Sequence, residues 1–510
     1  MRDPVAVATL EHERLAALFG APVERRIDTH AASVFLTRES AWKAKRPVRL
    51  DYLDFSTPAL RRAALEAELA LNQPLAPDLY RRVHAVTRDA DGALRLDGTG
   101  PAIDWVLEMR RFADGALLVE MAGQGRLEPS MLVRLVDRIV DFHACAPPCH
   151  DMPGARRLLE VIAGNVRSAA RFPELLPADL VARLDRRLRE TAAALAPLLD
   201  ARAREGRVRH GHGDLHLSNI ALVDGEPTPF DRLEFSPALA TGDLLYDLAF
   251  LVMDLWQSGA QPEANLVFNR YLDRSPADET GAPLMPLFMS VRAFVRAHTT
   301  ALRARQGGQA AEAAAARVYL ELALSFLCPV PPRLVAVGGA SGTGKSAFAR
   351  AVAHRLGHAP GARILRTDVL RKRAAGVLPE TRLAGPSYSA HATAQVYAAL
   401  RTAAREALAG GVAVIADATF LDPREQAAME AVAAGLGVRF DGVWLSAVED
   451  VRVARVSARA ADASDADAAV ARAQTPIAAP PPGWHRLCAE GPLEEVAAAG
   501  LAALEGPPRR

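Results

Sequence analysis

An apolar segment, a glycine-rich loop and a helical pattern follow one another without a break between residues 334 and 356. Residues 334–338 (Leu-Val-Ala-Val-Gly) are typical of a buried strand, and residues 347–356 have the apolar spacing of an amphipathic helix. The loop between them matches the pattern Gly-x-x-x-x-Gly-Lys-Ser/Thr and consists of Gly339, Ala340, Ser341, Gly342, Thr343, Gly344, Lys345 and Ser346. Such a loop, between a strand and a helix, predicts an α/β fold with a phosphate site at the carboxyl end of the strand.

The residues of this loop suit the chemistry of a nucleotide tail. Backbone N–H groups turn inward around phosphate oxygens, and the helix that follows adds partial positive charge. We expect Lys345 to neutralise the outer phosphates of ATP and Ser346 to bind Mg²⁺. A glycine-rich turn without a ligand is the competing interpretation, which the flanking strand and helix disfavour.

Carboxylates and arginines elsewhere in this region suit the same site. Asp417 ends the apolar segment Ile415-Ala-Asp, where a phosphate-loop protein holds Mg²⁺ or its water. Asp368 follows a predicted strand over 362–367, so it would face the same crevice and accept a proton from an acceptor hydroxyl. A helix cap or a turn is the alternative for each aspartate. Arg455, with Arg452 and Arg459 at helical spacing, would either close over ATP or form a solvated basic face.

Prolines divide the chain near residues 329–332. The segment Cys328-Pro-Val-Pro-Pro-Arg cannot continue the helical pattern of 310–327. The prediction is one domain over 1–328, a proline-rich linker over 329–332 and a second domain over 333–510.

The two predicted domains differ in their pattern. In the second, strands alternate with helices, which predicts an α/β fold with a parallel sheet covered on both faces. Its predicted strands are 334–338, 362–367, 412–416 and 440–446, and its predicted helices are 346–356, 391–409, 424–435, 449–460 and 493–504. In the first, a strand hairpin (33–37 and 41–45), a helix (58–72) and a strand (103–109) precede mostly helical sequence. That order predicts a two-lobed α+β domain.

Bulk properties limit the environment and the partners. The 510 residues have a net charge of +1, so no nucleic-acid or membrane partner is expected from charge alone. No apolar run reaches the length of a membrane span, and the first residues lack the apolar run of a signal peptide. Four cysteines do not form a disulfide framework, so a cytoplasmic location is expected. The oligomeric state does not follow from the sequence.

A second set of phosphoryl-transfer residues lies in the first domain. The segment His212-Gly-Asp214-Leu-His-Leu-Ser-Asn219 has an aspartate and an asparagine five residues apart, and Asp231 follows. Phosphoryl transfer needs a carboxylate that orients or deprotonates the acceptor hydroxyl, and oxygen ligands for Mg²⁺. Asp214 suits the first role, while Asn219 and Asp231 suit the second.

This segment resembles the aminoglycoside phosphotransferase-like family, whose motif is His-Gly-Asp-x-x-x-x-Asn, over about residues 25–325. The resemblance implies a protein-kinase-like fold in which a strand lysine grips ATP and pairs with a helix glutamate. The chain has only four lysines among 61 basic residues, and Lys43 and Lys45 lie on one face of a predicted strand. Either would be the ATP lysine, with Glu68, or else Glu66, as its partner.

Residues 333–510 resemble the small AAA-type P-loop kinases that include gluconate kinase and the zeta-toxin kinases. The whole chain is similar to bifunctional fusions of an aminoglycoside phosphotransferase-like domain with a P-loop ATP-binding domain. The resemblance implies an ATP- and Mg²⁺-dependent phosphotransferase with two nucleotide sites, each acting on a hydroxyl of a small molecule. The alternative is a single kinase whose P-loop domain is a regulatory ATP switch. The predicted helix 291–305 favours an anionic acceptor, since it carries Arg292, Arg296, Arg303 and Arg305.

Overall fold

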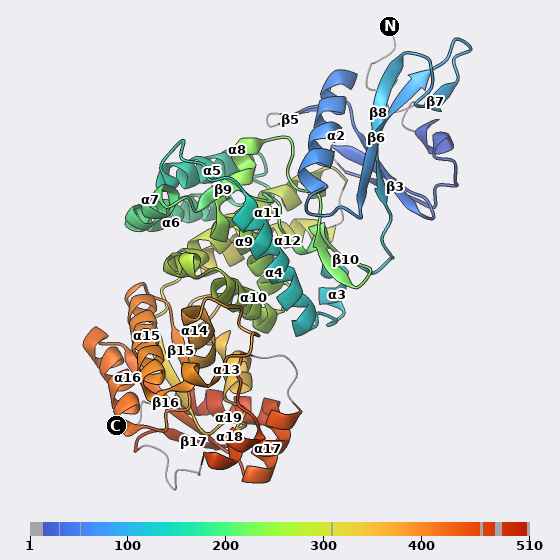
Figure 1. Cartoon of the computed structure of the whole chain (residues 1–510). Helices are drawn as coiled ribbons and strands as arrows, with labels where there is room; N and C mark the ends of the chain where they lie inside the picture. The colour runs from blue at the N-terminus through green and yellow to red at the C-terminus, as the bar shows by residue number, and fades with distance from the viewer. Residues whose placement is uncertain are drawn as a thin grey trace. The chain divides into compact units, whose positions relative to one another are not determined.

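The computed structural model of the chain describes residues 14–29, 31–50, 53–307, 310–458, 463–474 and 482–506. They fall into two compact units, each made of several stretches of sequence (Figure 1). The first unit lies within residues 1–181, 196–254 and 295–318. The second lies within residues 182–195, 255–294 and 319–510.

The first unit begins with an antiparallel sheet of six strands in the order β1-β2-β3-β8-β6-β7. The predicted hairpin is confirmed, because Val34 pairs with Lys43 and Ala32 with Lys45. Helix α2 packs against β6 and β8, and begins where the Thr57 hydroxyl accepts a hydrogen bond from the Leu60 amide. The bounds are β1 (Arg25–Asp28), β2 (Ala32–Leu36), β3 (Ser40–Lys45), α2 (Pro58–Asn72), β6 (Tyr80–Arg88), β7 (Leu94–Leu96) and β8 (Ala102–Arg110).

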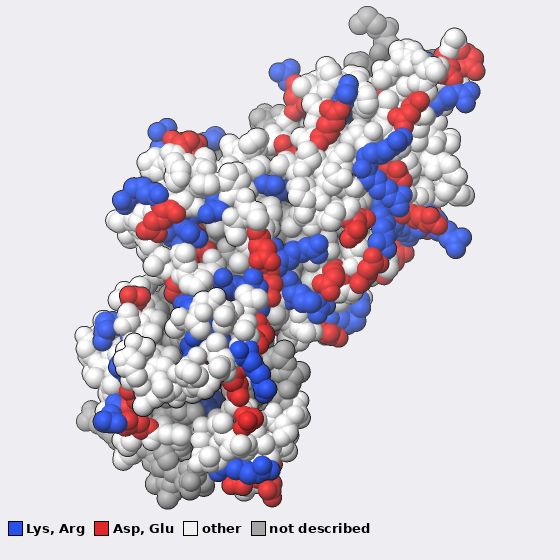
Figure 2. Space-filling model, in the orientation of Figure 1, with Lys and Arg blue, Asp and Glu red and all other residues white. Residues whose placement is uncertain are grey.

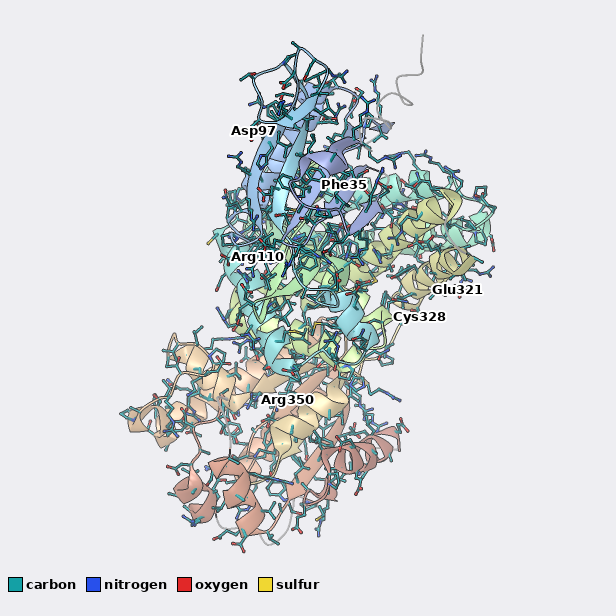
Figure 3. All side chains as sticks on the ribbon, turned by 90° about the vertical axis from the view of Figure 1, so that its right-hand side faces the viewer. Phe35, Asp97, Arg110, Glu321, Cys328 and Arg350 are labelled. Atoms are coloured by element: carbon teal, nitrogen blue, oxygen red, sulfur yellow. The ribbon has the colours of Figure 1, made fainter. Side chains whose placement is uncertain are left out.

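Helices follow this sheet, with short strands between them, as the sequence predicts. A sheet followed by helices is the two-lobed α+β arrangement that the sequence predicts. Its elements include α4 (Pro129–Cys145), α5 (Gly154–Ala169), α7 (Ala196–Arg204), β9 (Val208–His210), η2 (Leu217–Asn219), β10 (Ile220–Val223), β11 (Glu226–Pro229) and β12 (Thr241–Asp243). The residues of four helices are divided between the two units: α6 (Ala178–Ala194), α9 (Leu244–Gln257), α11 (Met285–Arg305) and α12 (Ala310–Ser325). Figure 3 shows Glu321 on α12 and Cys328 just beyond the end of this helix.

The second unit contains a parallel sheet of five strands in the order β14-β15-β13-β16-β17. Side chains alternate between its faces: Leu334 and Ala336 pack with α15 and α16, whereas Val335 and Val337 pack with α13 and α19. The predicted α/β fold is therefore confirmed. The elements are β13 (Arg333–Gly338), α13 (Lys345–Ala353), β14 (Arg363–Arg366), α14 (Thr367–Ala374), α15 (Ala390–Ala409), β15 (Val414–Asp417), α16 (Pro423–Leu436), β16 (Arg439–Ser446), α17 (Glu449–Ser457), α18 (Ala468–Ala473), β17 (His485–Cys488) and α19 (Leu493–Glu505).

One boundary differs from the prediction at a candidate site residue. Strand β14 ends at Arg366, and Asp368 lies in the first turn of α14 rather than at the end of the strand. The strand passes into the helix without a glycine or proline, so the sequence does not mark the change.

The second unit also includes helix α10 (Gln261–Arg274) and the 3₁₀ helix η3 (Pro276–Leu284). The Asn265 side chain of α10 donates to the backbone carbonyls of Pro360 and Ala362. The side-chain oxygen of Asn269 accepts a hydrogen bond from the Ile364 amide. These side chains satisfy backbone groups of β14 and of the residues just before it, and β14 is an edge strand of the sheet.

A buried arginine joins the same elements. The Arg363 guanidinium is 1% exposed and donates to Asp273 at 2.7 Å and to Glu279 at 2.6 Å. It also donates to the side-chain oxygen of Asn269 at 3.0 Å. Burial lowers the pKa of Arg363, but the two carboxylates raise it by more, so the guanidinium stays charged.

Charged side chains of both signs are interspersed on the face of the molecule that Figure 2 shows. Within the part of the chain that the structure describes, no helix is both long and apolar enough to cross a membrane.

Candidate active sites

A buried carboxylate binds the backbone of the loop that carries Asp214. Asp247 of α9 accepts hydrogen bonds from the backbone amides of His212 (2.7 Å) and Gly213 (2.9 Å), and it also contacts the His143 ring at 3.1 Å. Gly213 has a φ of +83°, which favours glycine. These contacts fix the backbone conformation immediately before Asp214.

Asp214 and Asn219 lie together, as their spacing predicts. The Asn219 amide donates to the Asp214 carboxylate at 2.9 Å and to its backbone carbonyl at 3.0 Å. His216 lies 3.4 Å from the same carboxylate. Partial burial raises the pKa of Asp214, but His216, His212 and Arg296 lower it by more, so the carboxylate is ionised. Its side chain is 37% exposed, so a substrate can reach it.

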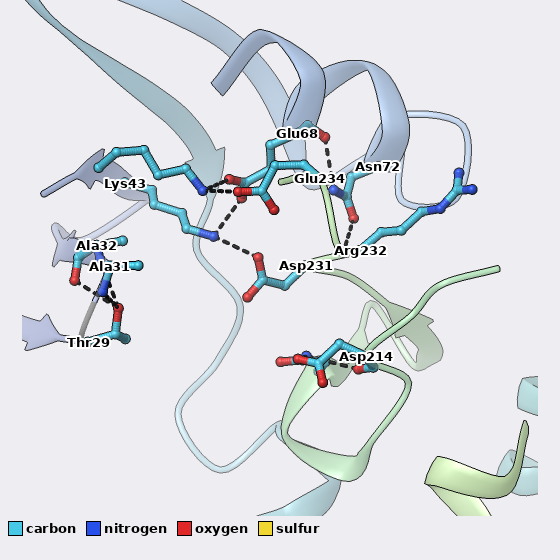
Figure 4. Close-up of polar contacts among 12 residues, drawn as sticks. Thr29, Ala31, Ala32, Lys43, Glu68, Asn72, Asp214, Asp231, Arg232 and Glu234 are labelled. Atoms are coloured by element: carbon cyan, nitrogen blue, oxygen red, sulfur yellow. Dashed lines mark hydrogen bonds and ion pairs between the residues drawn. The ribbon is translucent and has the colours of Figure 1, made fainter. Parts of the chain in front are cut away.

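Lys43 and Lys45 both contact the carboxylate of Glu68, which is fully buried (Figure 4). Each ammonium group lies 2.7 Å from a different oxygen of that carboxylate. The alternative partner, Glu66, is half-exposed and pairs with Arg62 instead. Lys43 also contacts Asp231 at 2.6 Å, so this lysine brings the metal-ligand candidate and the helix glutamate together.

Two residues of this cluster were not foreseen from the sequence. Glu234 accepts a hydrogen bond from Lys45 at 2.5 Å. Asn72 of α2 donates to the Glu68 carbonyl and accepts from the Arg232 amide, which connects the helix to the Asp231 segment. Neither belongs to a recognisable motif, and the only sequence signal is that Glu234 follows Asp231 by three residues.

The predicted arginine row on α11 does not act as a group. Arg305 donates to the Arg171 carbonyl and lies over the Phe172 ring, and Arg303 donates to Thr300. Arg292 is buried in the second unit. Arg296 is close enough to Asp214 to lower its pKa. The row therefore does not converge on this site, because its members are spread along the length of α11.

In the second unit, the glycine-rich loop lines a cavity of about 730 Å³. Gly342 has a φ of +85°, and a Cβ atom at this position would meet the carbonyl oxygen of Arg452. The Lys345 ammonium donates to the Ala340 carbonyl at 2.9 Å, and the Ser346 hydroxyl donates to Asp417 at 2.5 Å. The cation, the hydroxyl and the carboxylate predicted for one phosphate site thus lie together.

Asp368 and Arg455 line the same cavity. Burial and the nearby Asp417 raise the pKa of Asp368, and together they outweigh the lowering by Arg366, Ser464 and Lys345. A carboxylate with a raised pKa is suited to accept a proton. The structure thus brings Asp368 to the crevice although its secondary structure differs from the prediction.

The other two arginines at helical spacing are Arg452, which is not among the described residues that line this cavity, and Arg459. Arg452 is buried and donates to the Ala471 carbonyl, and Arg459 lies outside the described residues. Gln474, which the sequence did not single out, accepts from the Ser341 amide of the glycine-rich loop at 2.6 Å.

Known proteins match both parts of the chain. Residues 334–481 match the AAA domain family. The uncharacterized protein Rv2004c of Mycobacterium tuberculosis is 34% identical over 482 residues, which cover 92% of each protein. A thermostable mutant of the aminoglycoside phosphotransferase APH(4)-Ia is similar over 61% of this chain and 98% of its own, at 13% identity and a TM-score of 0.37. A gluconokinase from Sinorhizobium meliloti 1021 is similar over 35% of this chain and 95% of its own, at 24% identity and a TM-score of 0.25.

The match to the AAA domain and the two folds described above agree with the expected pairing. An α+β part comes first in the chain, and a P-loop part follows it.

Proposed function

The chain belongs to the family of Rv2004c, and from this premise we propose that it is an ATP- and Mg²⁺-dependent phosphotransferase with two nucleotide sites. Each site would transfer the γ-phosphoryl group to a hydroxyl of a small-molecule acceptor. The sequence domains would be 1–328 and 333–510, joined by residues 329–332. One observation carries the proposal: each unit separately brings together a lysine, side-chain oxygens suited to a cation and an accessible carboxylate.

In the first unit, the hydroxyl oxygen of the acceptor would attack the γ-phosphorus of ATP, and Asp214 would accept the proton of that hydroxyl. The bond from the γ-phosphorus to the bridging oxygen would break, and ADP would leave. Asn219 and Asp231 would hold Mg²⁺, which neutralises charge on the phosphates. Lys43 would contact the phosphates and Glu68 would orient it. The side chains of Asp214 and Asp231 support this assignment, since they are 37% and 38% exposed.

In the second unit, Asp368 would be the proton acceptor of an equivalent reaction. Residues 339–346 would wrap the phosphates, with Lys345 as the cation, while Ser346 and Asp417 would hold Mg²⁺. Arg455 would stabilise the charge of the transition state, which its place in the same cavity supports. Gln474 would leave the Ser341 amide when a phosphate oxygen takes its place.

The acceptor of the first unit would be anionic. Arg296 lies near Asp214, and a guanidinium beside the reacting hydroxyl attracts a carboxylate or phosphate of the acceptor and disfavours a polycation. Efficient phosphorylation of an aminoglycoside would contradict this assignment.

The test is transfer of labelled γ-phosphate from ATP into an extract of small metabolites. We would compare the intact protein, Asp214→Ala, Lys345→Ala and the control Asp224→Ala, whose carboxylate is exposed and pairs with Arg110. Each of the first two variants is expected to abolish a different product, and the control is expected to abolish none. If Asp214→Ala alone abolishes a product, and Lys345→Ala only alters its rate, the P-loop domain is a regulatory switch. A protein that labels nothing would refute the proposal.

A further inference from the structure

The buried cluster on β3 and α2 contains one more lysine than a single phosphate contact requires. Lys43 and Lys45 divide the two oxygens of Glu68 between them, because side chains two residues apart lie on the same face of a strand. Figure 4 shows the Lys43 ammonium group between the carboxylates of Glu68 and Asp231. The two lysines therefore share one partner, and their other contacts distinguish them.

The second contact of each lysine lies in a different environment. Lys43 reaches Asp231, whose side chain is 38% exposed, whereas Lys45 reaches Glu234, whose side chain is 6% exposed. A nucleotide or a cation that approaches Asp231 competes for its contact with Lys43. The contact between Lys45 and Glu234 is shielded, and Lys45 also lies 5.3 Å from the centre of the Phe55 ring. Ligand binding can thus redirect Lys43 while Lys45 stays in place.

Charge explains why Lys45 is needed. The cluster contains three carboxylates, Glu68, Asp231 and Glu234, and two ammonium groups. Without Lys45, Lys43 would be the only cation in the cluster facing three carboxylates, and attraction to them would hold it away from a phosphate. The Arg232 amide donates a hydrogen bond to the Asn72 side chain, which keeps α2 beside the Asp231 segment. Glu68 is therefore fixed both by its helix and by the lysines of β3.

We propose that Lys45 and Glu234 are positioning residues, which hold Glu68 in place so that Lys43 is free to bind the nucleotide. This inference rests on the proposed function of the first unit. It assigns the nucleotide contact to Lys43 alone and gives Glu234 a role that no motif indicates.

The test is a double-mutant cycle in the full chain carrying Lys345→Ala, which silences the P-loop site. The rate measured is formation of the labelled product that Asp214→Ala abolishes, at several ATP concentrations. Lys45→Met is expected to lower kcat/KM for ATP roughly tenfold, and Lys43→Met is expected to lower it further. When both lysines are replaced, the loss should equal that of Lys43→Met alone, because Lys45 acts only through Lys43.

Other outcomes would overturn the inference. Equal losses from Lys45→Met with and without Lys43 would mean that Lys45 acts independently, and full activity of Lys45→Met would mean that it has no role. If Lys45→Met does not fold, Glu234→Gln replaces it, since it keeps the size and the hydrogen-bond acceptor. Glu234→Gln is expected to lower kcat/KM several-fold only when Lys43 is present. A Lys43→Met protein with unchanged product formation would instead refute the proposed function of this unit.

Discussion

Replacement of Arg363 by methionine tests whether α10 and η3 stabilise the sheet of the second unit. Methionine keeps an apolar stem but removes the charge of a side chain that is 1% exposed. The side chains of Asp273 and Glu279, which are 16% and 18% exposed, lose this partner, although Glu279 keeps Arg373 at 3.3 Å. Breaking a buried ion pair from one side costs about 3–5 kcal/mol. Because both carboxylates retain some access to water, we expect a loss of about 3 kcal/mol in the free energy of unfolding of this unit.

The assay is hydrogen exchange of peptides covering β13 and β14, followed through a urea titration. With a urea dependence of about 2–3 kcal/mol per molar, the loss shifts the unfolding midpoint down by about 1 M. The matched control is Arg401→Met, which breaks the Arg401–Glu425 pair of the same unit, where the side chains are 26% and 21% exposed. Pairs near the surface contribute less than about 1 kcal/mol, so the control should shift the midpoint much less. Equal midpoints for the two variants would refute the reasoning.

Three further predictions concern the two sites. As the pH falls, the product that depends on Lys345 should disappear at a higher pH than the product that depends on Asp214, because the pKa of Asp368 is raised above 3.8 and that of Asp214 is lowered below it. A base must be ionised to accept a proton, so parallel loss of both products in one sample would contradict the assignment. Gly342→Ala should reduce the Lys345-dependent product at least about tenfold through backbone strain and leave the other product unchanged, as product analysis can show. Glu68→Gln should lower kcat/KM of the first site roughly a hundredfold, whereas Glu66→Gln on the same helix should change it less than about twofold.

Secondary structure was predictable where the apolar pattern agrees with the positions of glycine, proline and polar turn residues. The hairpin around Lys43 and four of the five strands of the parallel sheet were expected within a few residues of their observed bounds. Strand β17 and helix α14 were missed, since β17 (His-Arg-Leu-Cys) has no apolar run and α14 follows β14 without a break. Local sequence determines a long amphipathic helix, but it does not mark a junction that tertiary packing imposes.

The residues of the candidate sites were likewise predictable only in part. Motif residues such as Asp214 and Asn219 are close in sequence, so their spacing alone predicted their contact. Glu234 and Asn72 were not predictable, because their roles depend on contacts with residues 160 or more positions away. The attachment of α10 to β14 was missed for the same reason, since Asn269 looks like any polar residue of a helix until its partner strand is known.

The four lysines give this protein a built-in set of spectroscopic probes. Lys43, Lys45 and Lys372 are buried and Lys345 is partly buried, and Lys372 donates to Asp465, which lines the cavity of the second unit. Isotope labelling of lysine alone would therefore produce four side-chain signals, two from each unit. Titration with a nucleotide would move the signals of the unit that binds it, so occupancy of each unit could be followed separately in the unmodified chain.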